Sequence, residues 1–211
     1  MNKATAKALI IVGLTFLTGL YFYNLVPDMM ASHWDFRGNV NGYMSKFWGL
    51  FLMPIISFVI FLLLVFIPKL DPLKANVDKF RKYFEGFIML ILIFLFYIYV
   101  ITLLWNLDYK FDMTRLMIPA IAILLYYSGV MMAHSKRNWF IGIRTPWTLS
   151  SDVVWDKTHK RGAILMKITA VLSLVGFFWP DYLLYFFFTP LMFTVFYTMI
   201  YSYLEYKKIA K

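Results

Sequence analysis

The sequence contains no cysteine, few histidines and few charged residues. Of its 211 residues 3 are His and 15% are charged, whereas 62% are hydrophobic and 21% are aromatic. The lack of cysteine excludes disulfide bonds, a thiolate nucleophile and cysteine-bound metal. The low charge excludes an ordinary water-soluble domain, because such a domain needs more polar side chains to cover its surface. The composition therefore predicts an integral membrane protein.

Six apolar stretches are long enough to cross about 30 Å of hydrocarbon as helices, which takes roughly 20 residues each. Runs such as FWGLFLMPIISFVIFLLLVFI are apolar on every face, which favours lipid-embedded helices over barrel strands with their period of two. We predict an all-α polytopic bundle of six transmembrane helices, with residues 1–211 forming a single membrane domain. The expected spans are approximately 8–26, 47–67, 86–107, 116–133, 163–179 and 182–204.

Lysine and arginine predict the orientation of these spans, because both accumulate in cytoplasmic loops. Sixteen basic residues fall on one side of the membrane and four on the other, with Lys167 just inside the fifth span. We therefore expect both termini in the cytoplasm of a prokaryotic plasma membrane. The net charge of +10 is explained by insertion and by attraction to anionic lipid, so no direct nucleic-acid partner is predicted. The four basic residues of the outer side are Arg37, Lys46, Lys110 and Arg115.

The spans lack the residues that most membrane catalysts and pumps require. Apart from Lys167 they contain no ionisable side chain, which disfavours a proton-coupled pump. An intramembrane hydrolase is disfavoured as well, because the three histidines are scattered and no nucleophile and base share one depth. We predict no enzymatic activity, no catalytic residues, no metal and no cofactor. The last span carries a polar stripe that interhelical hydrogen bonds and a proline kink explain, with a ligand path as the alternative. The stripe consists of Pro190, Thr194, Thr198, Tyr201 and Glu205.

The loop at residues 27–46 is expected on the outer side and reads VPDMMASHWDFRGNVNGYMSK. Its glycines permit positive φ and its asparagines close local turns, which predicts a structured loop. Two interpretations stay open: the aromatic side chains pack the loop onto the bundle rim, or the loop recognises an extracellular ligand. The candidate ligand-binding residues are His33, Trp34, Asp35, Gly38, Gly42, Tyr43 and Lys46.

The loop at residues 135–162 is expected on the inner side and contains IGIRTPWTLSSDVVW. Thr145 precedes a proline and must be extended, and Ser150 or Ser151 followed by Asp152 favours a helix start. We expect a short interfacial helix from about Asp152, with Trp155 on an exposed sticky edge or in the lipid headgroups. The planar guanidinium of Arg144 is suited to bind a carboxylate or a lipid phosphate through two hydrogen bonds. The candidate partner-binding residues are Gly142, Arg144, Thr145, Pro146, Trp147, Thr148 and Trp155.

The two loops carry a family resemblance. IGIRTPWTLSSDVVW resembles the signature of the SdpI family, bacterial immunity membrane proteins against a secreted sporulation-associated killing peptide, and the outer loop resembles its DUF1648 segment. Ala31 stands where the usual outer pattern has proline, and Asn41 where it has an acid. The resemblance implies a receptor that resists a toxin and holds a small DNA-binding autorepressor at the membrane.

These observations lead to one hypothesis and one alternative. The hypothesis is a non-enzymatic immunity and signal-transduction protein whose outer loop recognises a secreted antimicrobial peptide and whose inner loop recruits a cytoplasmic transcriptional repressor. Membrane lipids are the other expected partners. The alternative is a carrier or flippase-like transporter of small amphiphiles, which the aromatic-rich spans permit. Ligand-dependent flux in proteoliposomes discriminates between them.

Overall fold

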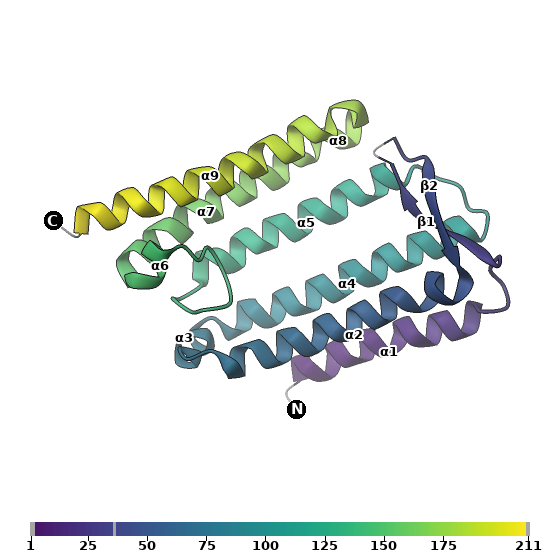
Figure 1. Cartoon of the computed structure of the whole chain (residues 1–211), viewed down its shortest axis with the longest axis horizontal. Helices are drawn as coiled ribbons and strands as arrows, with labels where there is room; N and C mark the ends of the chain where they lie inside the picture. The colour runs from purple at the N-terminus through teal and green to yellow at the C-terminus, as the bar shows by residue number, and fades with distance from the viewer. Residues whose placement is uncertain (1–2, 36, 210–211) are drawn as a thin grey trace. The chain divides into compact units, whose positions relative to one another are not determined.

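The computed structural model describes residues 3–35 and 37–209, which are mainly helical (Figure 1). Six helical segments in this part of the chain are long and apolar enough to cross a membrane, which confirms the predicted number of spans. They are α1 (Lys3–Phe22), α2 (Lys46–Leu70), α4 (Arg81–Asn106), α5 (Met113–His134), α7 (Asp152–Ser173) continued by α8 (Val175–Phe178), and α9 (Leu183–Ile209). Most of these helices extend beyond the predicted spans, because polar ends continue the helix outside the apolar stretch.

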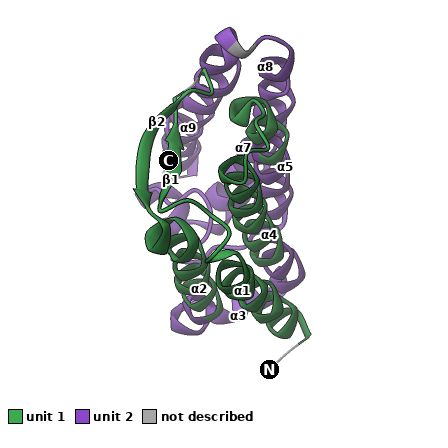
Figure 2. Cartoon of the chain, turned by 90° about the vertical axis from the view of Figure 1, so that its right-hand side faces the viewer, with its two compact units in different colours: residues 1–65, 88–120 green, residues 66–87, 121–211 purple. Residues whose placement is uncertain are grey.

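The chain divides into two compact units (Figure 2). The first comprises residues 1–65 and 88–120, and the second comprises residues 66–87 and 121–211. Helices α2, α4 and α5 each contribute one segment to either unit. The two loops singled out from the sequence fall in different units, so each is described within its own.

The first unit contains a β-hairpin where the sequence predicted a structured loop. Strands β1 (Met29–Trp34) and β2 (Val40–Ser45) pair antiparallel, with Met30 opposite Met44 and Ala31 opposite Tyr43. The turn between them uses Gly38 at φ +81°, a conformation that glycine adopts without steric cost. The hairpin is anchored by a small apolar cluster of buried residues from the turn after α1, from β1, from α2 and from α4, namely Val26, Met30, Leu50 and Leu103.

The second unit is organised around α7 and α9, which run side by side (Figure 1). The polar stripe of the last span faces inward, with Thr194, Thr198, Ser202 and Glu205 all buried. Lys157 on α7 donates to Glu205 at 2.7 Å, and Lys208 binds the other oxygen of the same carboxylate at 2.7 Å. These contacts confirm that the stripe serves helix packing. The remaining elements are α3 (Lys74–Lys79), α6 (Pro146–Ser150) and the 3-10 turn η1 (Pro180–Tyr182).

The short helix before the fifth span is present, but it lies earlier in the chain than expected. It is α6, and Asp152 already begins the long helix α7. The residue between them, Ser151, is extended and its hydroxyl caps α7 by accepting from the N–H of Val154 at 3.4 Å. The expected helix start at Ser151 and Asp152 is therefore confirmed, whereas a separate interfacial helix beginning at Asp152 is wrong, because no break follows it until Leu174.

Candidate functional site

Residues 135–151, called the signature loop here, connect α5 to α7 in the second unit and are fastened to two aromatic side chains of α7. The indole N–H of Trp155 donates to the carbonyl of Ser135 at 3.2 Å. The N–H of Ile143 donates to Nε2 of His159 at 2.9 Å. The rings of Trp155 and His159 stack with centroids 3.9 Å apart. The loop is thus held at its first residue and near its middle by one face of α7.

The hydrogen bonds of His159 determine its tautomer. Because Nε2 accepts from the N–H of Ile143, it carries no proton. Nδ1 therefore bears the hydrogen and donates to the carbonyl of Trp155, which lies 2.9 Å away. A neutral imidazole satisfies both partners, and only 1% of the residue is exposed. His159 thus connects α7 to the signature loop through hydrogen bonds to both.

Gly142 lies directly against the imidazole of His159. Its φ is +108°, and a Cβ placed there would lie 2.4 Å from Nε2 of His159. Both the backbone conformation and the close approach require glycine. Gly142 was expected among the partner-binding residues, and in the structure it lets the loop contact the imidazole.

The interior of the signature loop is organised by the amide of Asn138, which is fully buried. Its Oδ1 accepts from the N–H groups of Phe140 and Ile141 at 3.0 and 2.6 Å. Its Nδ2 donates to the carbonyls of Lys136 and Ile141 at 2.8 and 3.0 Å. One side chain therefore replaces the backbone pairing that a loop of this length otherwise lacks.

A second connection, residues 71–80, is joined to the signature loop. The buried carboxylate of Asp71 accepts from the N–H of Leu73 at 2.7 Å and from the N–H of Trp139 at 2.9 Å. The amide of Asn76 on α3 donates to the carbonyl of Arg137 at 2.9 Å. The two connections form one polar platform, and a surface formed by the signature loop is consequently rigid in its backbone.

Helix α6 begins with a reciprocal cap. Thr145 is extended, as expected before Pro146, and its hydroxyl accepts from the N–H of Thr148 at 3.2 Å. The hydroxyl of Thr148 in turn accepts from the N–H of Thr145 at 3.0 Å. This capping box holds the first turn, and Thr145 also lies 3.0 Å from the hydroxyl of Ser202 on α9. The ring of Trp147 packs on Tyr203 with centroids 5.1 Å apart.

The exposed side of the signature loop is aromatic and basic. Trp139 is 51% exposed and Phe140 is 40% exposed. The guanidinium of Arg144 donates to the carbonyl of Trp139 at 3.0 Å. Within residues 3–35 and 37–209 Arg144 forms no ion pair, so most of its donors face outward beside the aromatic pair. Trp139, Phe140, Arg144 and Pro146 are called the loop tip below.

The structure divides the partner-binding residues expected from the sequence into two groups. Arg144 and Pro146 are exposed, whereas Gly142, Thr145, Thr148 and Trp147 hold the loop through the contacts described above. Trp155 is 0% exposed, so the expected sticky edge at this residue is not present and its ring is part of the loop's support. Trp139 and Phe140 were missed. The string NWFIG before the signature is the signal that could have found them.

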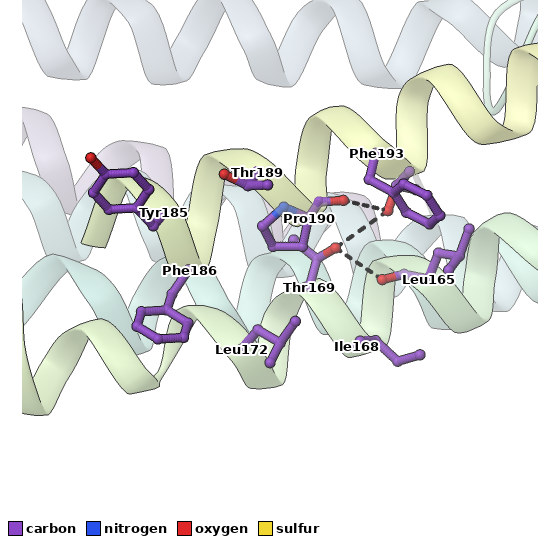
Figure 3. Close-up of a pocket in the computed structure, with 10 residues that line it drawn as sticks. Leu165, Ile168, Thr169, Leu172, Tyr185, Phe186, Thr189, Pro190 and Phe193 are labelled. Carbon is purple, nitrogen blue, oxygen red and sulfur yellow. Dashed lines mark hydrogen bonds between the residues drawn. The ribbon is translucent and has the colours of Figure 1, made fainter. Parts of the chain in front are cut away.

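The α7 and α9 pair also forms a groove of about 430 Å³ (Figure 3). Its lining is almost entirely apolar, and at its base the hydroxyls of Thr169 and Thr194 lie 3.3 Å apart. Each hydroxyl also donates within its own helix, Thr169 to Leu165 and Thr194 to Pro190. The groove therefore offers apolar surface, and the hydroxyls of Thr169 and Thr194 are already satisfied within their own helices.

The hairpin in the first unit contains the candidate ligand-binding residues, and several of them build its shape. Asp35 accepts from the N–H groups of Arg37 and Asn39, both at 2.9 Å. The hydrogen bond from the N–H of Asn39 lowers the pKa of Asp35 below its ordinary value of 3.8. Gly38 approaches Asp112, and His33 donates to Asn41 across the strands. These residues position the turn.

The other hairpin residues differ in how much they expose. Trp34 packs edge-on against Trp105 of α4, with centroids 5.5 Å apart. Lys46 binds Asp28 at 2.7 Å, and this ion pair lowers the pKa of Asp28. Gly42 lies in β2 opposite His33 without positive φ, so its expected turn role is wrong. Tyr43 is 60% exposed. The hairpin thus packs through Trp34 and exposes Tyr43, and recognition of an extracellular ligand stays a prediction.

Metal binding was not expected at either place. Within residues 3–35 and 37–209 no group of three or more histidine and acidic side chains is arranged to hold a metal ion. The loop tip presents the exposed guanidinium of Arg144, and the hairpin presents the exposed ring of Tyr43.

Comparison with known proteins identifies both places. Residues 10–58 match the domain of unknown function DUF1648, which covers most of α1, the hairpin and the first half of α2. Residues 135–202 match the SdpI/YfhL protein family, which covers the signature loop, α7 and most of α9. The immunity protein SdpI of Bacillus subtilis (strain 168) is 26% identical over 209 residues, or 98% of each protein. No solved structure shows significant similarity. The chain is thus a multi-pass protein of the bacterial cell membrane that is similar to the SdpI/YfhL protein family over residues 135–202 and to DUF1648 over residues 10–58.

Proposed function

We propose that this protein is a non-enzymatic membrane immunity protein that protects its cell against a secreted toxin-like peptide. The observation that carries this proposal is the similarity to a protein named for immunity, which extends over 98% of both chains. Similarity of that extent includes the hairpin and the signature loop together, so it supports the function of the whole chain and not of one segment.

The proposed orientation places the hairpin outside the cell and the signature loop inside. Six crossings put both termini on the same side of the membrane as residues 71–80 and the signature loop. Sixteen of the 21 lysines and arginines belong to that side. The cytoplasmic bias of basic loops then assigns it to the cell interior.

The hairpin is the proposed surface for the toxin-like peptide. Its turn is held by Asp35 and its base by Lys46, so its backbone is ordered before any ligand binds. Tyr43 presents an exposed ring, and tyrosine is enriched in binding interfaces because it offers a large apolar area with a polar tip.

The loop tip is the proposed surface for a cytoplasmic repressor. The fork of Arg144 suits a carboxylate of a protein partner, and Trp139 and Phe140 supply apolar area next to it. The polar platform beneath keeps these groups in place. Coupling between the two surfaces requires that the peptide bind two states of the bundle unequally.

Survival of a toxin-sensitive bacterium tests the proposal. Cells expressing this chain are exposed to the sporulation-associated killing peptide that the family resemblance names, and an unrelated six-span protein at equal abundance serves as the control. We expect growth at peptide concentrations that kill the control cells. Equal killing of both strains across a panel of secreted peptides would refute the immunity function.

The groove between α7 and α9 favours the second candidate, a carrier of small amphiphiles. An apolar groove of about 430 Å³ on two membrane-spanning helices has the volume for a lipid chain or a similar molecule. Purified protein in liposomes loaded with a fluorescent phospholipid analogue tests this function. Transbilayer movement faster than in protein-free liposomes would support a carrier, and equal rates would exclude it.

A further inference from the structure

One edge of the β-hairpin, along β2, has backbone groups that are unpaired within the described part of the chain and can bind a peptide. The register pairs Met29 with Ser45, Met30 with Met44 and Ala31 with Tyr43. The pair that precedes Met29 and Ser45 consists of Asp28 and Lys46. It is a hydrogen-bonded pair, because the N–H of Lys46 donates to the carbonyl of Asp28 at 2.8 Å. Bonded and non-bonded pairs alternate in an antiparallel ladder. The backbone groups of Ala31 and Tyr43 therefore point away from the opposite strand.

The β1 edge agrees with this register and is closed at Ala31. Oδ1 of Asn106, the last residue of α4, accepts from the N–H of Ala31 at 2.7 Å. Its Nδ2 donates to the carbonyl of Ala31 at 3.0 Å. One amide side chain thus pairs with the outward backbone groups of Ala31 as a neighbouring strand would. The first unit has covered this edge of its hairpin.

The β2 edge has no such cover. Tyr43 is the cross-strand neighbour of Ala31, so its N–H and carbonyl point outward on the other side, and the N–H of Ser45 follows in the same direction. From residues 3–35 and 37–209 no hydrogen bond reaches these three groups. Tyr43 and Ser45 are both exposed. These three backbone groups point outward along one edge of β2, where they can form hydrogen bonds with one more strand.

We propose that an extended segment of a peptide adds to the free edge of β2 as a third strand, an inference that rests on the proposed function and names its binding mode. Strand addition gives affinity through main-chain hydrogen bonds. Tyr43 forms the central two-bond pair, and Ser45 donates the next bond. Asn41, Tyr43 and Ser45 flank the side chains on one face of the added strand, which fits a peptide with polar and aromatic residues on that face.

Proline at position 43 tests the inference, because it removes the outward N–H and leaves the β1 ladder intact. Proline is tolerated on an edge strand where the N–H faces solvent. Met29→Pro is the matched control, since Met29 is also in a non-bonded pair, on the opposite edge, and is equally exposed at 57%. We expect Tyr43→Pro to weaken binding of the killing peptide about tenfold or more, the effect of one interfacial hydrogen bond, and Met29→Pro to leave it unchanged. Equal binding by both variants overturns the inference.

A cross-linking experiment avoids any dependence on the folding of the proline variants. The photoreactive tyrosine analogue benzoylphenylalanine replaces Tyr43 in the otherwise unchanged chain, which is irradiated in membranes with the killing peptide. A covalent adduct with the peptide supports strand addition. A dimer of the chain, or no adduct, overturns it.

The two experiments also separate this inference from the proposed function. Survival conferred by both the unchanged chain and the Tyr43→Pro variant upholds immunity and overturns strand addition. Failure of the unchanged chain to protect cells refutes immunity, and the adduct at position 43 then decides strand addition by itself.

Discussion

The imidazole of His159 accepts a hydrogen bond from the backbone N–H of Ile143 at 2.9 Å, across 16 positions of sequence. This bond joins the signature loop to α7 at the point where Gly142 passes closest to the helix. The ring also stacks on Trp155, whose indole N–H donates to Ser135, so two hydrogen bonds of the loop depend on one buried aromatic pair of α7. The recognition surface at the loop tip depends on this support, and the first two predictions address it.

Gly142→Ala should destabilise the protein by about 2 kcal/mol, because alanine at φ +108° is strained and its Cβ would overlap Nε2 of His159. Gly13→Ala is the control, since nothing lies within 4 Å of a Cβ at that position. Thermal unfolding of the detergent-solubilised variants measures both effects. Equal melting temperatures of Gly142→Ala and Gly13→Ala would show that the close contact between Gly142 and His159 does not stabilise the protein.

His159→Phe should keep the stack on Trp155 and lose the acceptor for Ile143. An unpaired buried N–H costs about 1–3 kcal/mol, so the melting temperature should fall. His134→Phe makes the same replacement at an exposed histidine stacked on Tyr83 and should have a smaller effect. Hydrogen exchange at the Ile143 amide provides a direct reading, and unchanged protection in His159→Phe would contradict the prediction.

Arg144→Gln should abolish recruitment of a cytoplasmic repressor and leave folding intact, because the guanidinium is exposed and has no ion pair within the described residues. The measurement is membrane localisation of a fluorescently tagged autorepressor of the kind that the family resemblance implies. Arg161→Gln, at an exposed arginine of α7 outside the loop tip, is the control. Unchanged localisation in Arg144→Gln would remove this residue from the partner site. Trp147 is less suitable for the test, because it also packs on Tyr203.

The orientation can be tested without background, because the chain has no cysteine. A membrane-impermeant maleimide added to intact cells should label Tyr43→Cys and should not label Pro146→Cys. After the cells are lysed both variants should react, which controls for accessibility. Labelling of position 146 in intact cells would place the signature loop outside and refute the proposed division of roles.

The turn of the hairpin should loosen in acid. The hydrogen bond from Asn39 lowers the pKa of Asp35, so ionised Asp35 binds the folded turn better than protonated Asp35 does. This contribution is present above the ordinary pKa of 3.8 and is lost as the pH falls through the lower folded value. Hydrogen exchange at the Asn39 amide between pH 5 and pH 2, with Asp35→Asn as the control, measures it. An acid transition of the same size in Asp35→Asn would assign the effect to another group.

The six spans and the helix start at Ser151 were predictable from the sequence by itself. A stretch of about 20 apolar residues has no stable place other than a membrane helix, and the cap at Ser151 depends only on neighbours within three residues. The polar stripe of α9 was predictable for the same reason, because helical periodicity places Thr194 and Thr198 on one face. The helix that begins after Thr145 was not predicted.

Tertiary structure alone decided which loop residues are buried and which strand edge is open. Trp155 and Trp139 are equally apolar, but one lies under the signature loop and the other on its exposed side, since the loop crosses the face of α7 that carries His159. The hairpin edge at Ala31 is closed by Asn106, 75 residues away, while no hydrogen bond from the described part of the chain reaches the edge at Tyr43. Such contacts join residues far apart in the chain, and local periodicity holds no information about them.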